Sequence, residues 1–214
     1  MSISSEVEQY LNESAGYYPP GQDEYFARIA LEQANIAFRE GNYGIGAVAV
    51  VATVKKVSEF PNRNAMITGI GVTDHAETRA LFDIRSGRLP IKTYNRNLNQ
   101  STADLPEGIS VFGTLEPCPM CDCALTNVGA KLSVSTVLDG QLIQKDGLSL
   151  SNGAANAIGE KGNIKPQVWQ WIQKESGLVF RLLDTEDTQL VTLSRRIFEE
   201  TREEIDTVLA QRGN

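Results

Sequence analysis

The sequence predicts an α/β fold with three layers, α/β/α, in which helices cover both faces of a mixed, about five-stranded sheet. Apolar residues recur at helical spacing through residues 22–40, and a continuous apolar run follows at 45–54. Helix-like and strand-like segments then alternate along the rest of the chain. Such alternation is typical of a sheet with helices packed on its faces.

The first long helix has acidic residues, Asp23 and Glu24, in its first turn, where the helix dipole favours negative charge, and Gly41 ends it. Its positions at helical spacing are Phe26, Ile29, Ala30, Gln33, Ile36 and Ala37. The run at 45–54 is continuous rather than alternating, which predicts a strand buried on both faces. Residues 56–60 are expected to be its shorter hairpin partner.

The remaining elements follow from the same two periodicities. They are helices at 4–15, 74–86, 118–127, 166–175 and 187–210, and strands at 109–114, 132–138 and 178–183. Two polar stretches lie between them. Residues 92–107, rich in Asn, are expected to form an inserted surface loop, and residues 140–162, rich in Gly, Ser, Asn and Ala, a flap or a second inserted loop.

The composition is that of one globular domain, residues 1–214. Of the 214 residues, 41% are apolar and 22% are charged, and no apolar stretch approaches the roughly 20 residues of a membrane span. The first residues lack the basic region and apolar run of a secretory signal. The three cysteines supply no disulfide framework, so a cytoplasmic location is expected.

Two short segments carry the chemistry, a His-x-Glu sequence and a later Pro-Cys-x-x-Cys sequence. His75, the only histidine, and the thiolates of Cys118 and Cys121 are good zinc ligands, and three ligands leave the fourth tetrahedral position free for water. Zinc lowers the pKa of such water to about 7. Glu77 follows His75 by two residues, so we expect it to move protons rather than bind the metal.

The motifs have two other interpretations, a redox dithiol and a purely structural zinc site. A lone Cys-x-x-Cys could be a redox dithiol, but Pro119 and Met120 between the cysteines, and the distant His-x-Glu, argue against this. A purely structural zinc site usually has a fourth Cys or His, and Cys123 is the candidate. Two positions after Cys121 on a helix, Cys123 should instead point away from the metal and pack as a small buried residue.

The two motifs together resemble the signature of the zinc-dependent nucleobase and nucleoside deaminases, the cytidine/deoxycytidylate deaminase superfamily. The wording Glu-Pro-Cys-x-Met-Cys at 116–121 is most similar to the branch of guanine deaminases, fungal-type cytosine deaminases and tRNA adenosine deaminases. The resemblance covers residues 22–140, the expected core, and leaves helical extensions at both ends. It implies the cytidine deaminase-like fold, a bound Zn²⁺ ion and a hydrolytic deaminase that releases ammonia, with Glu77 as its catalytic residue.

The resemblance also implies substrate contacts. Relatives carry a substrate-binding Asn before the metal-binding His, and Asn64 stands at the corresponding place here, eleven residues before His75. Asn62 is the nearby alternative, and both residues could simply form a turn after Pro61. The backbone of Ala76 is expected to face the substrate as well.

The substrate implied first is a small amino-substituted nitrogen heterocycle, a guanine-like base or a nucleoside. The alternative is a deaminase of adenosine or cytidine in tRNA or another nucleic acid, and a third interpretation is a catalytically silent, zinc-stabilised interaction protein. The net charge of −7 and the scattered Lys and Arg residues disfavour nucleic acid. Residues 85–96 are the best candidate for a local basic patch.

A homodimer is expected, because relatives commonly pair through helices and loops beside the metal site. No membrane partner is expected. The long C-terminal helix offers apolar residues for burial, either in such an interface or against the sheet of its own chain. These residues are Leu190, Leu193, Ile197 and Ile205.

Overall fold

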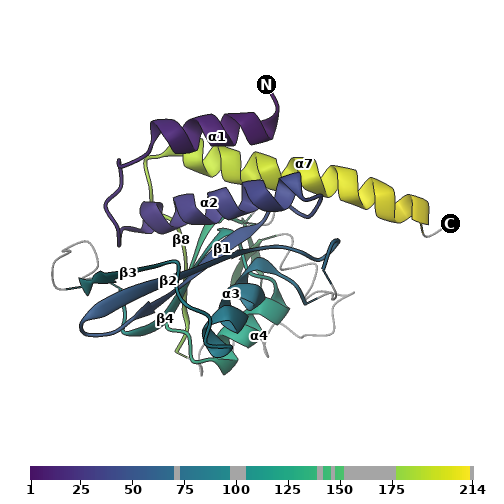
Figure 1. Ribbon diagram of the computed structural model, residues 1–214. Helices are drawn as coiled ribbons and strands as arrows, with labels where there is room; N and C mark the ends of the chain where they lie inside the picture. The colour runs from purple at the N-terminus through teal and green to yellow at the C-terminus, as the bar shows by residue number, and fades with distance from the viewer. Residues whose placement is uncertain (70–72, 97–104, 139–141, 146–147, 152–176, 213–214) are drawn as a thin grey trace.

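A six-stranded mixed sheet organises the part of the chain that the computed structural model describes, residues 1–69, 73–96, 105–138, 142–145, 148–151 and 177–212 (Figure 1). The strand order is β3-β2-β1-β4-β5-β8. The strands are β1 Gly46–Ala52, β2 Lys56–Arg63, β3 Lys92–Asn95, β4 Gly108–Leu115, β5 Leu132–Val137 and β8 Val179–Leu182. The helices are α1 Ile3–Glu13, α2 Asp23–Arg39, α3 Ala76–Arg85, α4 Pro119–Asn127 and α7 Thr188–Arg212. A separate sheet pairs β6, Leu142–Lys145, with β7, Leu148–Ser151.

Strand β1 lies inside the sheet because its residues are apolar on both faces. Val48 and Val50 belong to the core cluster shared with α1, α2 and α7, and Ala47 and Ala49 to the cluster shared with α3 and α4. β1 pairs antiparallel with β2 and β4, whereas β4, β5 and β8 run parallel. The expected three-layer α/β fold with a mixed sheet is therefore confirmed.

Helices α1, α2 and α7 lie together on one face of the sheet, and α3 and α4 lie on the other (Figure 1). Leu190, Leu193 and Ile197 of α7 are buried in the same cluster as Phe26 of α2, while Ile205 is half-buried. The C-terminal helix thus covers the sheet of its own chain, one of the two uses predicted for its apolar residues. Among the described helices, none is both long enough and apolar enough to cross a membrane.

Two stretches expected as loops contain strands, so those expectations were wrong in part. Strand β3 lies within the polar stretch 92–107 and pairs with β2, which makes six strands rather than five. β3 is an edge strand with mostly exposed residues, and such a strand needs no alternating apolar residues that a sequence could reveal. Strands β6 and β7 form a hairpin inside 140–162. The helix expected at 166–175 lies outside the described residues.

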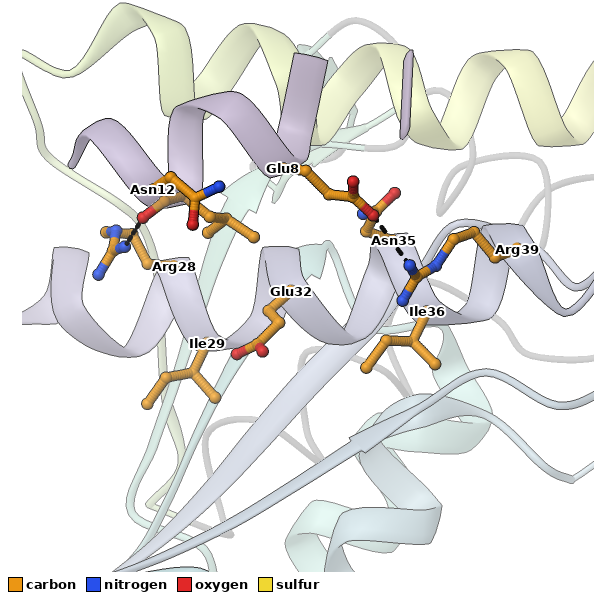
Figure 2. A pocket seen from close by; sticks show the side chains of 9 residues that line it. Glu8, Asn12, Arg28, Ile29, Glu32, Asn35, Ile36 and Arg39 are labelled. Carbon is orange, nitrogen blue, oxygen red and sulfur yellow. Dashed lines mark hydrogen bonds and ion pairs between the residues drawn. The ribbon is translucent and has the colours of Figure 1, made fainter. Parts of the chain in front are cut away.

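A groove of about 500 Å³ lies between α1 and α2 (Figure 2). Arg39 of α2 reaches across it to Glu8 of α1, at 2.8 Å. Its lining residues are Glu8, Leu11, Asn12, Arg28, Ile29, Glu32, Asn35, Ile36 and Arg39. The groove belongs to the helix layer opposite α3 and α4 and contains no residue of the two motifs, so it is not the candidate active site (Figure 1).

Candidate metal centre

Two helix starts bring the motif residues together. His75 is the N-cap of α3, Cys118 is the N-cap of α4, and Cys121 lies in the first turn of α4. Pro119 begins α4, where its fixed φ and missing N–H suit the first helical position. Because α3 and α4 pack against each other on the same face of the sheet (Figure 1), residues 43 positions apart in the sequence meet.

The three expected ligands have the spacing of a zinc site. The Nδ1 atom of His75 lies 3.6 Å from the sulfur of Cys118 and 3.5 Å from that of Cys121, and the two sulfurs are 3.5 Å apart. Zinc bonds of about 2.3 Å to sulfur and 2.0 Å to nitrogen, at tetrahedral angles, place sulfur and nitrogen about 3.5 Å apart and two sulfurs about 3.8 Å apart. Cys123 is half-buried and is not part of this group. The donor set therefore fits zinc through three protein ligands.

The charges of the group also suit a divalent cation. The hydrogen bond with Cys121 and the neighbouring His75 lower the pKa of Cys118 to about 4, against the opposing effect of burial. The pKa of Cys121 is raised, because it shares a proton with Cys118 and is buried. Burial opposes protonation of His75, but the hydrogen bond and charge of Cys118 outweigh it and raise its pKa. Without a cation, one of the two sulfurs keeps the proton and the other is the thiolate. A bound cation stabilises both as thiolates.

Glu77 lies beside the metal-binding group without belonging to it. Its side chain is 4% exposed, and its Oε2 is 3.5 Å from the sulfur of Cys121. Burial raises the pKa of Glu77, and the charge of Cys118 adds to this effect. The carboxyl therefore holds a proton more readily than an exposed glutamate does, as a group that both takes and gives a proton must.

Asp122 is a further acidic residue at the site that the sequence analysis missed. It is 3% exposed, and its Oδ1 has no hydrogen-bond partner among the described residues. Burial, together with the negative charges of Glu77, Cys118 and Glu116, raises the pKa of Asp122 to about 8. The signal was present in the spacing, because Asp122 follows Cys118 by four residues and so shares its side of α4.

The two candidate substrate-binding asparagines differ in their contacts. The Nδ2 of Asn62 donates to Asp83, at 2.9 Å, and its Oδ1 accepts from Arg79, at 3.1 Å. Both polar atoms of its amide are therefore already bonded within the protein. Asn64 is fully buried, yet its Nδ2 has no partner among the described residues. The turn after Asn64 is joined to the segment before His75 by a hydrogen bond of 2.9 Å from the backbone N–H of Ala65 to the carbonyl of Asp74.

Ala76, the other expected substrate contact, is the first residue of α3 and is fully buried between His75 and Glu77. Its place at the helix start fits the expectation that its backbone faces the substrate, because the first N–H groups of a helix have no partner within the helix.

Two cations of the stretch 85–96, Arg88 and Lys92, lie apart from each other. Arg88 pairs with Asp83 of α3, at 3.1 Å. Lys92 donates to the hydroxyl of Tyr25, at 2.7 Å, on the face of the sheet that α2 covers. Arg88 and Lys92 therefore point to opposite faces of the sheet and do not share one surface for phosphates.

The fold and the two helix starts define a class of protein, an α/β protein with a His/Cys/Cys metal site at two helix starts on one face of a mixed sheet. The family model of the cytidine and deoxycytidylate deaminase zinc-binding region matches residues 20–136. The chain therefore belongs to this zinc-binding family, and the predicted family and cofactor are confirmed.

Individual relatives agree with this assignment. A tRNA-specific adenosine deaminase of Aquifex aeolicus (strain VF5) is 32% identical over 116 residues, which are 54% of this chain and 66%, just under two thirds, of that protein. The solved structure of NE0047 in complex with 2,6-diaminopurine is 14% identical, covers 90% of this chain and 88% of its own, and has a TM-score of 0.55. A variant of NE0047 in complex with 8-azaguanine is 16% identical, covers 84% and 87%, and has a TM-score of 0.52. The two structures support the fold.

We predict that the purified protein binds about one zinc ion per chain and that replacing both Cys118 and Cys121 with Ala removes it. The double variant should also unfold at a lower temperature, because metal binding is coupled to folding. Elemental analysis and thermal unfolding measure the two effects. Cys123→Ala is the matched control and should keep its zinc. Stoichiometric zinc in the double variant would disprove the assignment of these ligands.

Proposed function

We propose that the protein is a zinc-dependent hydrolytic deaminase, which removes the exocyclic amino group of a nitrogen heterocycle and releases ammonia. The observation that carries this proposal is the place of Glu77, a buried carboxyl 3.5 Å from Cys121 that is not one of the three metal-binding side chains. A purely structural zinc site has no use for such a carboxyl, whereas hydrolysis needs a group that moves protons.

The proposed reaction adds water to the amino-bearing carbon of the ring. His75, Cys118 and Cys121 would hold the zinc ion, which supplies a Lewis acid that activates water. Glu77 takes a proton from the water and gives it to a ring nitrogen, and the new C–O bond forms. Glu77 then takes the remaining proton from the new C–OH group and passes it to the amino group, the C–N bond breaks, ammonia leaves and the ring keeps a carbonyl group.

Among substrates, we propose a free guanine-like base or a nucleoside. The structures of NE0047 with 2,6-diaminopurine and 8-azaguanine make free purine bases the first compounds to test. The net charge of −7 and the separation of Arg88 from Lys92 favour a small substrate over a polyanion. The buried Nδ2 of Asn64 could donate to an acceptor on such a ring.

A tRNA or another nucleic acid is the second candidate substrate, and it is favoured by the 32% identity to a tRNA-specific adenosine deaminase. The catalytically silent interaction protein has less support, because Glu77 and all three ligand residues are present and in contact.

We predict that one base or nucleoside releases ammonia when the protein is tested against guanine, cytosine, adenosine, cytidine and a tRNA. The tRNA should release none, and the protein treated with a chelator should be inactive on every compound. Deamination confined to tRNA, with binding that weakens steeply as salt rises, would favour the second candidate. Ammonia release from none of them would contradict the proposed activity.

We predict that Glu77→Gln keeps its zinc while turnover falls by at least about 100-fold, the usual scale for a general acid–base group. The amide preserves the size of the side chain but cannot carry the proton. Glu59→Gln is the matched control, since Glu59 is also a fully buried carboxyl but lies on β2 and faces Tyr25 of α2. This control should keep its turnover, and an active Glu77→Gln enzyme would rule out the proposed role.

We predict that Asn64→Ala weakens substrate binding by about 1–3 kcal/mol, because the partner group on the substrate is left buried without a hydrogen bond. Asn62→Ala should instead lower the free energy of unfolding and leave KM nearly unchanged, since its amide binds Asp83 and Arg79. Steady-state kinetics and denaturant unfolding separate the two effects. The reverse pattern would move the substrate contact to Asn62.

We also propose a homodimer. The buried apolar residues of α7 pack against its own chain, so we place the pairing surface elsewhere. The exposed apolar residues on and after α3 are the candidates. Phe82, Leu89 and Ile91 are 68%, 85% and 68% exposed. Phe82 lies about two turns along the helix whose N-cap is His75.

We predict a dimer by light scattering at micromolar concentration, and a monomer for Phe82→Asp, because burying an unpaired carboxylate in an apolar interface is costly. Val54→Asp is the control, since Val54 is exposed to a similar extent, 61%, but lies in the turn between β1 and β2. A wild-type protein that stays monomeric would refute the dimer.

A further inference from the structure

One buried side chain outside the motifs, that of Asn42, is bonded to the turn that follows Asn64, residues 65–69. Asn42, fully buried in the connection between α2 and β1, accepts hydrogen bonds from the backbone N–H groups of Ile67 and Thr68, at 3.0 and 3.1 Å. Its Nδ2 donates to the hydroxyl of Thr68, at 2.8 Å. Within the described part of the chain, the hydrogen bonds of the Asn42 side chain thus all go to this turn.

The turn has few other supports. Ile67 and Thr68 are exposed, so they gain little from packing. At one end, the carbonyl oxygen of the Asn64 side chain accepts from the N–H of Met66, at 3.1 Å. At the other end Gly69 packs against Asp74, where an added Cβ would lie 2.3 Å from a carboxylate oxygen. The N–H of Gly69 also donates to the carbonyl of Ala65, at 2.6 Å, which closes the turn on itself. Among the described residues, Asn42 supplies the bonds from outside the turn that hold Ile67 and Thr68.

The connection that carries Asn42 is itself held by the C-terminal helix. The N–H of Gly44 donates to the hydroxyl of Thr201, at 2.9 Å, and Thr201 is only 3% exposed. Gly44 also lies directly against α7, because a Cβ there would be 2.5 Å from the carbonyl oxygen of Ile197. Helix α7 lies beyond residues 20–136, the part of the chain that the family model matches.

We propose that Asn42 is a positioning residue, which holds the turn after Asn64 in place for substrate and ties that turn to helix α7 through Gly44 and Thr201. The part that concerns substrate rests on the proposed role of Asn64. Helix α7, which lies outside the residues matched by the family model, would in this way influence substrate binding although it contributes no residue to the proposed site.

Amide hydrogen exchange tests the positioning directly and needs no substrate. In Asn42→Ala, the amides of Ile67 and Thr68 should exchange at least about tenfold faster, since both lose their acceptor. Asn42→Asp keeps that acceptor and should restore slow exchange. Thr68→Val removes only the bond to an exposed hydroxyl, so it should fold normally and show a smaller increase. Thr201→Val should speed exchange at Gly44 and at both turn amides.

Kinetics with guanine then separate positioning from stability. Asn42→Ala should raise KM about fivefold, the scale of one hydrogen bond, with kcat and zinc content nearly unchanged, and Asn42→Asp should recover most of the loss. Asn35→Ala is the matched control, because Asn35 is another buried asparagine, at 2% exposure, which lines the groove between α1 and α2 (Figure 2). It should lower the unfolding temperature without changing exchange at Ile67 and Thr68.

Wild-type exchange at Ile67 and Thr68 in Asn42→Ala would overturn the proposal, and so would a change in KM no larger than that of Asn35→Ala. Unchanged exchange at the turn amides in Thr201→Val would overturn the link to α7. Faster exchange in both Asn42→Ala and Thr201→Val, in a protein that releases ammonia from none of the compounds named above, would support the positioning and the link to α7 and would overturn the proposed function instead.

Discussion

The close approach of the starts of α3 and α4 is the constraint on which the rest of the structure depends. His75, Cys118 and Cys121 can share one metal ion only if these helices begin side by side, which leaves their ligand atoms 3.5–3.6 Å apart. The arrangement requires β1 and β4 to be neighbours, because α3 packs on β1 and β2 and α4 follows β4. The apolar residues of β1 are therefore as important for the site as the ligands themselves.

The metal centre concentrates acidic groups in a buried place, and this explains its electrostatics. Glu77, Cys118 and Asp122 lie close enough to influence one another, and burial disfavours the charged form of each. A divalent cation offsets this repulsion, whereas Glu77 and Asp122 hold protons more readily than exposed carboxyls do. The same burial that makes the site costly without a cation raises the pKa of Glu77, which suits the proton transfer that we propose for it.

The segments outside the family core are integrated into it rather than appended. Ile3 and Val7 of α1, together with Leu190 of α7, are buried in the same cluster as Val48 of β1. Arg196 of α7 pairs with Glu6 of α1, at 2.6 Å, beside that cluster. Helix α7 also contacts the connection between α2 and β1, because the N–H of Gly44 donates to Thr201. The next residue of this connection, Ile45, accepts a hydrogen bond from the N–H of Asn64. The two terminal helices thus enlarge the hydrophobic core, and α7 also contacts the connection that adjoins Asn64.

The sequence by itself determined the ligand set, the adjacent Glu77 and the alternation of helices and strands, because ligand chemistry and hydrophobic periodicity are local properties. Only the tertiary structure decided the matters that depend on contacts between distant segments. It showed β3 as a sixth strand, since an edge strand needs no apolar pattern, and it distinguished Asn64 from Asn62 by their partners. It also showed that α7 packs on the sheet of its own chain, which the sequence left open because an apolar helix face does not specify which surface will bury it.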